Sequence, residues 1–150
     1  MAQFISDKSK AYASELPAKG FYPALKIAEF QTLFHFLEDE TEPAILHNAI
    51  IERIAIHREL KPLTELHENM PALSLALFED EETAECLYKQ AVFCKTAHAL
   101  IGNRLATDAT EEAADRDESL QLRADKLLTN YRNAIDQLLQ TDSGYTFEMI

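Results

Sequence analysis

The five histidines are the residues of this chain best suited to metal binding or proton transfer. A di-metal helical bundle holds its ions through Glu-x-x-His pairs, in which an acidic residue stands three positions before each histidine. His35, His47, His57, His67 and His98 instead follow Thr32, Ala44, Ile54, Thr64 and Lys95. The sequence also contains no His-Glu-x-x-His zinc helix, no calcium loop and no glycine-rich phosphate loop, since its three glycines are isolated.

Two weaker chemical signals have simpler explanations. His57 could act as a base, but the sequence marks no partner for it, so we expect these histidines at the surface or an interface. His98 lies on an apolar stripe and is expected to be a core histidine whose ring nitrogens have hydrogen-bond partners. An acidic cluster could bind a divalent ion, but such a run is more typical of a solvated turn and a helix start; its members are Asp108, Glu111, Glu112, Asp115, Asp117 and Glu118. We therefore predict no catalytic residue, no metal site, no cofactor and no enzymatic activity.

The net charge of −12 limits the partners that the chain can have. Nucleic acids bind through cations that displace counterions, so an acidic domain is not expected to recognise DNA by sequence. For the same reason the chain is a poor candidate for binding an anionic membrane surface, and no apolar run is long enough to span a bilayer. Cys86 and Cys94 stand eight residues apart in one predicted helix, roughly 12 Å, which is too far for a disulfide. We expect a soluble, intracellular protein.

Few glycines and prolines, with abundant Ala, Leu and Glu, favour helices over strands. The length of 150 residues favours one domain. The pattern predicts an all-α fold, a small bundle of about four main helices over 27–37, 42–60, 83–104 and 116–141. Thr41 is expected to cap the second helix, with Pro43 in its first turn.

The remaining segments are predicted to be extended or short. Residues 1–22 are expected to form an extended N-terminal arm, with room for a short helix around 6–15. Residues 62–68 are expected to form a short helix, followed by an extended segment in which Leu73, Leu75 and Leu77 alternate. The helical domain then covers 23–142, and residues 143–150 form a separate C-terminal tail.

Two of these segments look suited to binding a partner. In the tail, Tyr145, Phe147 and Met149 alternate with polar residues up to Ile150, and tails of this kind can add a strand to a partner's sheet edge. The helix 42–60 is apolar over more than half its circumference. A helix of that kind is sandwiched between partners, either inside the domain or between subunits.

The order of several short motifs resembles one known family over residues 20–150. Phe21-Tyr22-Pro23 resembles an aromatic-aromatic-Pro entry to the first helix, and Thr41-Glu42-Pro43-Ala44-Ile45-Leu46 resembles the Thr-Pro-x-x-Leu opening of the second. Leu87-Tyr88-Lys89-Gln90-Ala91-Val92 is similar to a Leu-Tyr-x-Arg-Ala-Val stretch, with Gln90 where the family usually has Arg. The chain also shares a short tail ending in Ile, Phe147-Glu148-Met149-Ile150. Together these features resemble the head completion proteins of tailed bacteriophages.

This resemblance implies a structural protein of the virion neck. Copies of the chain would form a ring, a homo-dodecamer by portal symmetry, beneath the portal protein after DNA packaging, and would offer a surface to a tail terminator or neck protein. The tail residues Tyr145, Phe147, Met149 and Ile150 would then dock on the portal, and Ile45, Ile50 and Ile54 would lie at the subunit interface. An acidic lumen or rim would let DNA pass without sticking and would be formed by Asp108, Glu111, Glu112 and Asp115.

A second class of function also fits the charge. A cytoplasmic helical bundle with an acidic face could sequester a basic protein partner. Such a regulator should saturate its partner stoichiometrically, whereas a neck adaptor should assemble only on the portal.

Overall fold

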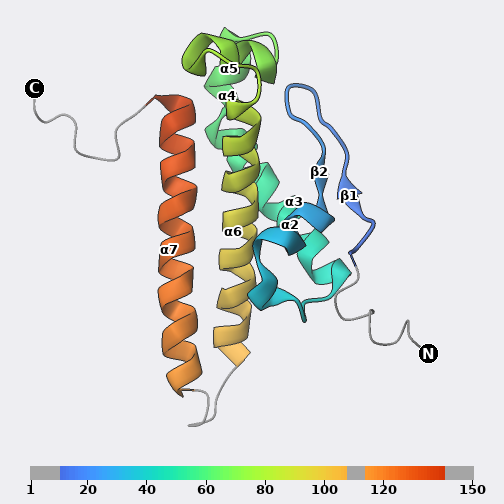
Figure 1. The fold of residues 1–150 in the computed structure, drawn as a ribbon, viewed down its shortest axis with the longest axis vertical. Helices are drawn as coiled ribbons and strands as arrows, with labels where there is room; N and C mark the ends of the chain where they lie inside the picture. The colour runs from blue at the N-terminus through green and yellow to red at the C-terminus, as the bar shows by residue number, and fades with distance from the viewer. Residues whose placement is uncertain (1–10, 108–113, 141–150) are drawn as a thin grey trace, which may run out of the picture.

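A computed structural model describes residues 11–107 and 114–140 of the chain. Helices dominate these residues, and two short strands pair beside them (Figure 1). The predicted all-α class is therefore confirmed. In the part of the chain that the structure describes, no helix is long and apolar enough to cross a membrane.

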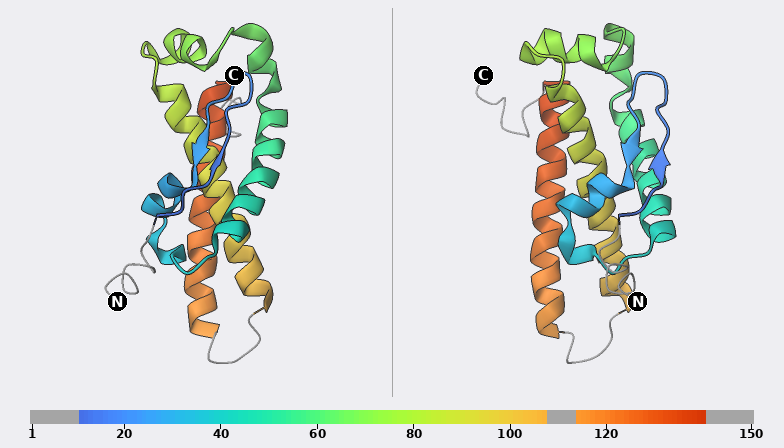
Figure 2. Two further views of the ribbon diagram at one scale, coloured as in Figure 1. Left: turned by 90° about the vertical axis from the view of Figure 1, so that its right-hand side faces the viewer. Right: turned by 45° about the vertical axis from the view of Figure 1, so that its right-hand side comes forward.

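The two longest helices, α6 (Thr83–Thr107) and α7 (Ala114–Leu139), lie side by side and antiparallel (Figures 1 and 2). They confirm the two predicted long helices, although α6 continues three residues beyond the expected end at 104. Gly102 does not interrupt it. α6 is the central element, because it packs against α7, α3 and α5. Its buried residues are Ala84, Tyr88, Ala91, Val92, Phe93, Cys94, Thr96, Ala97, Leu100 and Ile101.

The start of α6 is fixed by side chains that accept its free backbone N–H groups. Asp80 Oδ1 accepts from the N–H groups of Glu82 at 2.9 Å and Thr83 at 2.7 Å. Ser74, which is fully buried, accepts from the N–H of Ala84 at 3.0 Å. Helix starts leave such donors without partners inside the helix, and these contacts supply them.

Helix α3 (Glu42–Glu59) begins where the sequence predicts. The hydroxyl of Thr41 accepts from the N–H of Ala44 at 3.3 Å, and Pro43 lies in the first turn. The inner face of α3 packs on α6 through residues that are at most 1% exposed, namely Ile45, Ala49 and Ile56.

The extended segment predicted over 73–77 is wrong. The short helix α4 (Lys61–Leu66) is followed by a second helix, α5 (Met70–Phe78). Asn69 caps α5 by accepting from the N–H of Ala72 at 2.8 Å, and Pro71 lies in its first turn. These start signals outweigh the alternating leucines, of which Leu73 is buried while Leu75 is 49% exposed. Glu79 ends α5 in a left-handed conformation.

The N-terminal segment is extended, as expected, but residues 11–22 are not a free arm. Strand β1 (Glu15–Leu16) pairs with β2 (Leu25–Lys26), and the connecting turn uses Gly20 at a φ of 58°. Leu16 is 1% exposed, so this hairpin belongs to the core. The helix expected around 6–15 does not form over residues 11–15, while residues 6–10 lie outside the described part.

The first predicted helix, 27–37, is divided in two. Helix α2 (Ile27–Leu33) ends at Phe34, whose φ of −126° and ψ of 67° are not helical, and a 3-10 turn, η2 (His35–Leu37), follows. Phe30, Phe34 and Leu37 face the core from this segment. Arg104 on α6 holds the next loop by ion pairs with Asp39 and Glu40.

Candidate docking surfaces

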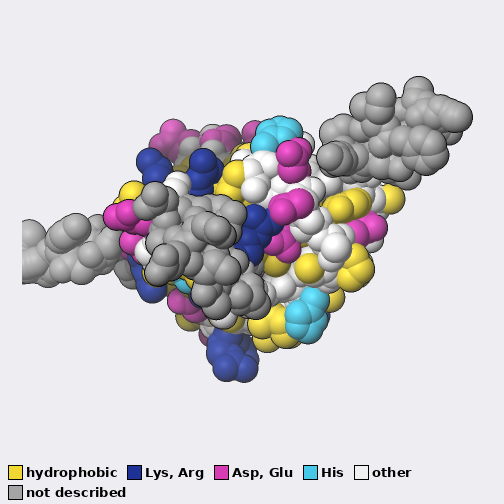
Figure 3. All heavy atoms as spheres, turned by 90° about the horizontal axis from the view of Figure 1, so that it is seen from below, with side chains coloured by type: hydrophobic (Ala, Val, Ile, Leu, Met, Phe, Trp, Pro, Cys, Tyr) yellow, Lys and Arg dark blue, Asp and Glu magenta, His cyan; other side chains and the backbone are white. Residues whose placement is uncertain are grey.

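The outer face of α3 exposes three isoleucines to solvent, which we call the isoleucine stripe. Ile50, Ile51 and Ile54 are 39%, 49% and 51% exposed. With 3.6 residues per turn, Ile54 lies between Ile50 and Ile51 around the helix, so the three side chains share one face. Exposed His47 and Arg58 lie at the two ends of this face. Seen from below the molecule, hydrophobic side chains reach the surface between acidic and histidine side chains (Figure 3).

One of the three residues expected at a subunit interface is misplaced. Ile45 is 1% exposed and packs in the core of its own chain, so it cannot reach a neighbouring subunit. Ile50 and Ile54 are exposed, and Ile51 completes their face although it was not predicted. A helix wheel identifies Ile51, because it stands four residues after His47 and three before Ile54.

A groove of about 390 Å³ lies on the surface between α2, α6 and α7. Its apolar walls include Leu33 of α2 and the next residue, Phe34, together with Cys86 and Cys94 of α6 and Leu127 of α7. Leu33 is 59% exposed and Cys86 is also exposed, so the groove is open along its edge. Cys94 is buried, and burial raises the pKa of its thiol to about 11.

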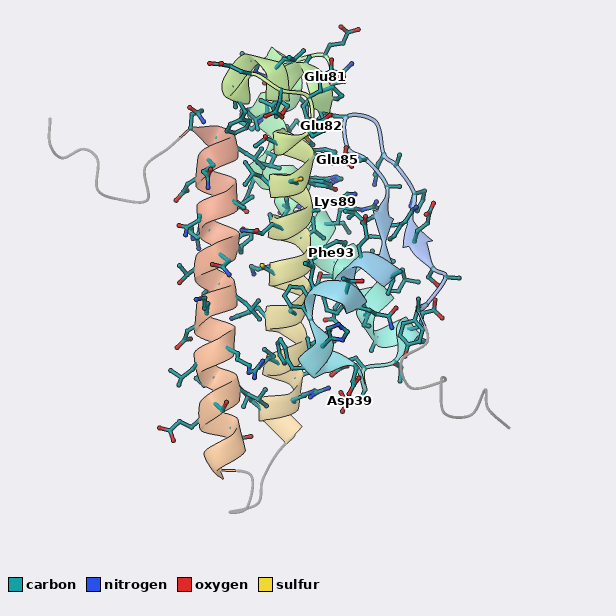
Figure 4. All side chains as sticks on the ribbon, viewed as in Figure 1. Asp39, Glu81, Glu82, Glu85, Lys89 and Phe93 are labelled. Carbon is teal, nitrogen blue, oxygen red and sulfur yellow. The ribbon has the colours of Figure 1, made fainter. Side chains whose placement is uncertain are left out.

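An ion-pair cluster forms one rim of the groove. Lys89 Nζ lies 3.3 Å from Glu29 Oε1 and 3.1 Å from Glu85 Oε2. Burial by itself lowers the pKa of Lys89, but its bonds to Glu85 and Glu29 outweigh that effect and raise it. Glu85 and Lys89 follow one another along α6 (Figure 4). Two carboxylates around one ammonium leave this rim with a net negative charge.

His57 does not lie free at the surface, contrary to the expectation for the histidines. Its ring stacks on Tyr22 with centroids 3.6 Å apart, and its Nε2 lies 2.6 Å from the hydroxyl of Tyr88. Burial, followed by the charges of Arg53 and Lys19, lowers the pKa of His57 to about 4. Burial also raises the pKa of Tyr88. A neutral imidazole and a neutral phenol therefore share this hydrogen bond at pH 7.

The three stacked rings of Tyr22, His57 and Tyr88 connect separate parts of the fold. Tyr22 comes from the hairpin, His57 from α3 and Tyr88 from α6, so the three rings join the N-terminal segment to the bundle. The sequence marks Tyr22 as part of the aromatic-aromatic-Pro motif, but it gives no signal that His57 meets it. His98, the expected core histidine, is half-buried, and burial lowers its pKa.

The other predicted site residues fall mostly outside the described part of the chain. Tyr145, Phe147, Met149 and Ile150 lie there, as do Asp108, Glu111 and Glu112. Asp115 lies in the first turn of α7. Across residues 11–107 and 114–140, no group of three or more His, Cys, Asp or Glu side chains is arranged to hold a metal ion.

The described residues thus form a helical bundle with two apolar surfaces and several ion pairs. The family model described as "Phage head completion protein (GPL)" matches residues 16–150. The chain belongs to this family. The comparisons with curated proteins and with solved structures gave no match.

Membership of the head completion family assigns the chain to virus assembly. The family consists of structural proteins of the phage head, and its members are not known as enzymes. The match begins at Leu16, the first buried residue of the hairpin, and it covers every helix described above. The motif order read from the sequence therefore identified the correct family.

Proposed function

We propose that this head completion protein is a connector subunit. Copies form a ring beneath the portal protein after DNA packaging, twelve copies by portal symmetry, and the ring offers a surface to a tail terminator or neck protein. The family match over residues 16–150 is the observation that carries this proposal. The exposed isoleucine stripe and the open groove support it, because apolar surfaces of this kind mark contacts with other proteins.

Retention on packaged heads tests the connector role. DNA-filled heads that lack this protein should lose their DNA to added nuclease, and purified protein should restore protection and remain with the heads in a sucrose gradient. Protein that stays at the top of the gradient while the heads remain leaky would refute the proposal.

The tail is proposed to dock on the portal by adding a strand to a sheet edge. Tyr145, Phe147 and Met149 would share one side of that strand and occupy pockets. Deleting 144–150 should then abolish binding to the portal while the far-ultraviolet circular dichroism keeps its helical signal. Substituting Thr146 and Glu148, on the other side of the strand, by serine and glutamine is the matched control and should retain binding. Undiminished binding after the deletion would disprove tail docking.

The connection between α6 and α7 is proposed to line the lumen or rim of the ring. Like charge keeps DNA from adhering to Asp108, Glu111, Glu112 and Asp115. Changing Glu111 and Glu112 to lysine should slow DNA release from completed heads. The same change at Glu81 and Glu82, which lie at the opposite end of α6 (Figure 4), provides a control of equal charge. Equal release rates for the two double variants would contradict the lumen assignment.

A further inference from the structure

Two exposed apolar surfaces of the chain are formed by different residues and different helices. The isoleucine stripe lies on the outer face of α3, whose inner face packs on α6. The groove is bordered by α2 and α7 on another side of α6. In the left-hand view of Figure 2, α2 and α3 flank α6, and the two helices also contact each other. Two different surfaces that do not overlap suit a head-to-tail contact, which is the contact that closes a ring.

We propose that the isoleucine stripe of one copy occupies the groove of the next copy around the ring. The inference rests on the proposed connector function and specifies which surfaces meet. Ile54 lies at the centre of the stripe and enters the groove between α2 and α7. Ile50 and Ile51 cover the groove edge, where Leu33 is exposed.

The charges at the edges of the two surfaces are complementary. Arg58 stands four residues after Ile54, about 6 Å along the helix, and it makes no ion pair among the described residues. The groove rim carries Glu29 and Glu85 around the single cation Lys89. When Ile54 occupies the groove, Arg58 comes within reach of that rim. The guanidinium of Arg58 is then a second cation beside the two carboxylates. Such pairs at an interface rim fix the orientation of the partners.

The size of the stripe indicates when the contact forms. A stable protein pair uses about 20–30 residues a side, whereas the stripe offers three isoleucines and two flanking polar residues. One stripe–groove contact is therefore weak in free solution. On a template that holds several copies side by side, each contact becomes intramolecular and the contacts reinforce one another.

The exposed thiol of Cys86 in the groove makes a direct test available. The Ile54→Cys variant places a second thiol on the stripe, and mild oxidation should join position 54 of one copy to Cys86 of the next. Heads completed with this variant should yield a ladder of linked dimers, trimers and larger species on a non-reducing gel. Cys94 is buried and does not compete.

Two controls define the contact. Adding Cys86→Ser should abolish the ladder, whereas a dimer that persists would show a symmetric contact between two stripes and overturn the proposal. Leu122→Cys, which is 67% exposed on α7, should give no ladder. A ladder from Leu122→Cys as strong as that from Ile54→Cys would also overturn the proposal. The absence of a ladder when the Ile54→Cys protein remains bound to the heads would do the same.

Charge reversal gives an independent readout. Arg58→Glu should lower retention on packaged heads about fivefold or more, while Lys126→Glu, on the exposed face of α7, should not. Equal retention of the two variants counts against the stripe–groove contact. These outcomes are separable from failure of the connector role, because in that case the wild-type protein itself would not remain on the heads.

Discussion

Acidification should destabilise the chain through His57, and the size of the effect follows from the aromatic stack. The ring stacks on Tyr22 and shares a hydrogen bond with the hydroxyl of Tyr88, and Arg53 and Lys19 are the cations that act on it. Its pKa is about 4 in the folded chain, compared with 6.5 as the ordinary value. Between these two pH values the unfolded chain binds a proton that the folded chain does not. Stability contributed by His57 is therefore full above pH 6.5, falls as the pH drops toward 4, and changes no further below 4.

The pKa difference sets an upper limit on the loss of stability. A shift from 6.5 to about 4 corresponds to at most about 3.4 kcal/mol, at 1.36 kcal/mol per pKa unit. The ring is half-buried, so solvent screening reduces the expected loss to about 1–2 kcal/mol. The measurement is the free energy of unfolding from urea titrations at about pH 7 and pH 4.5, followed by circular dichroism.

The matched control replaces both members of the hydrogen bond, because replacing His57 alone would leave the buried hydroxyl of Tyr88 without a partner. The double variant His57→Phe/Tyr88→Phe keeps the aromatic contacts and removes the titrating group, a change that can be nearly neutral at pH 7. Its loss of stability on acidification should be about 1–2 kcal/mol smaller than that of the wild type. An equal loss in both proteins would refute the assignment to His57, since the carboxylates titrate in both.

Four further variants test the packing, each by urea unfolding. Ser74→Ala leaves the buried N–H of Ala84 without an acceptor and should lower the free energy of unfolding by about 1–3 kcal/mol. The hydroxyl of Thr96 only donates to a helical carbonyl, so Thr96→Val should lower it by less than about 1 kcal/mol. Equal losses in the two variants would contradict this. Phe93→Ala removes a ring that is 1% exposed and should cost about 3–5 kcal/mol, so a loss under about 1 kcal/mol would show that the core repacks. Arg104→Gln breaks two partly exposed ion pairs and should cost no more than about 1 kcal/mol, with the difference shrinking in 1 M salt; a salt-independent loss would indicate lost packing instead.

The sequence predicts the helices of this fold best where caps and apolar spacing agree. Thr41 and Pro43 predicted the start of α3, and the apolar spacing predicted α6 and α7 to within a few residues. The apolar spacing does not predict α5 correctly. Leucines two residues apart fit a strand, whereas Asn69 and Pro71 begin a helix. In a helix with so many apolar residues, spacing alone does not distinguish the two structures.

The contacts that define the surfaces depend on tertiary structure and were harder to predict. The sequence identified α3 as apolar over more than half its circumference, but only its packing on α6 separates buried Ile45 from exposed Ile54. The groove combines residues from three helices up to about a hundred positions apart, so no local pattern predicts it. The position of His57 beside Tyr22 is also long-range, because those residues meet through the hairpin.

The antiparallel pair of α6 and α7 gives the molecule a fixed height. At 1.5 Å per residue, the 25 residues of α6 span about 37 Å from the α5 end to the opposite pole. A rod of packed helices resists compression and bending far better than a loop of the same reach. The number of helical turns in α6 and α7 therefore determines the distance between the two ends of the bundle.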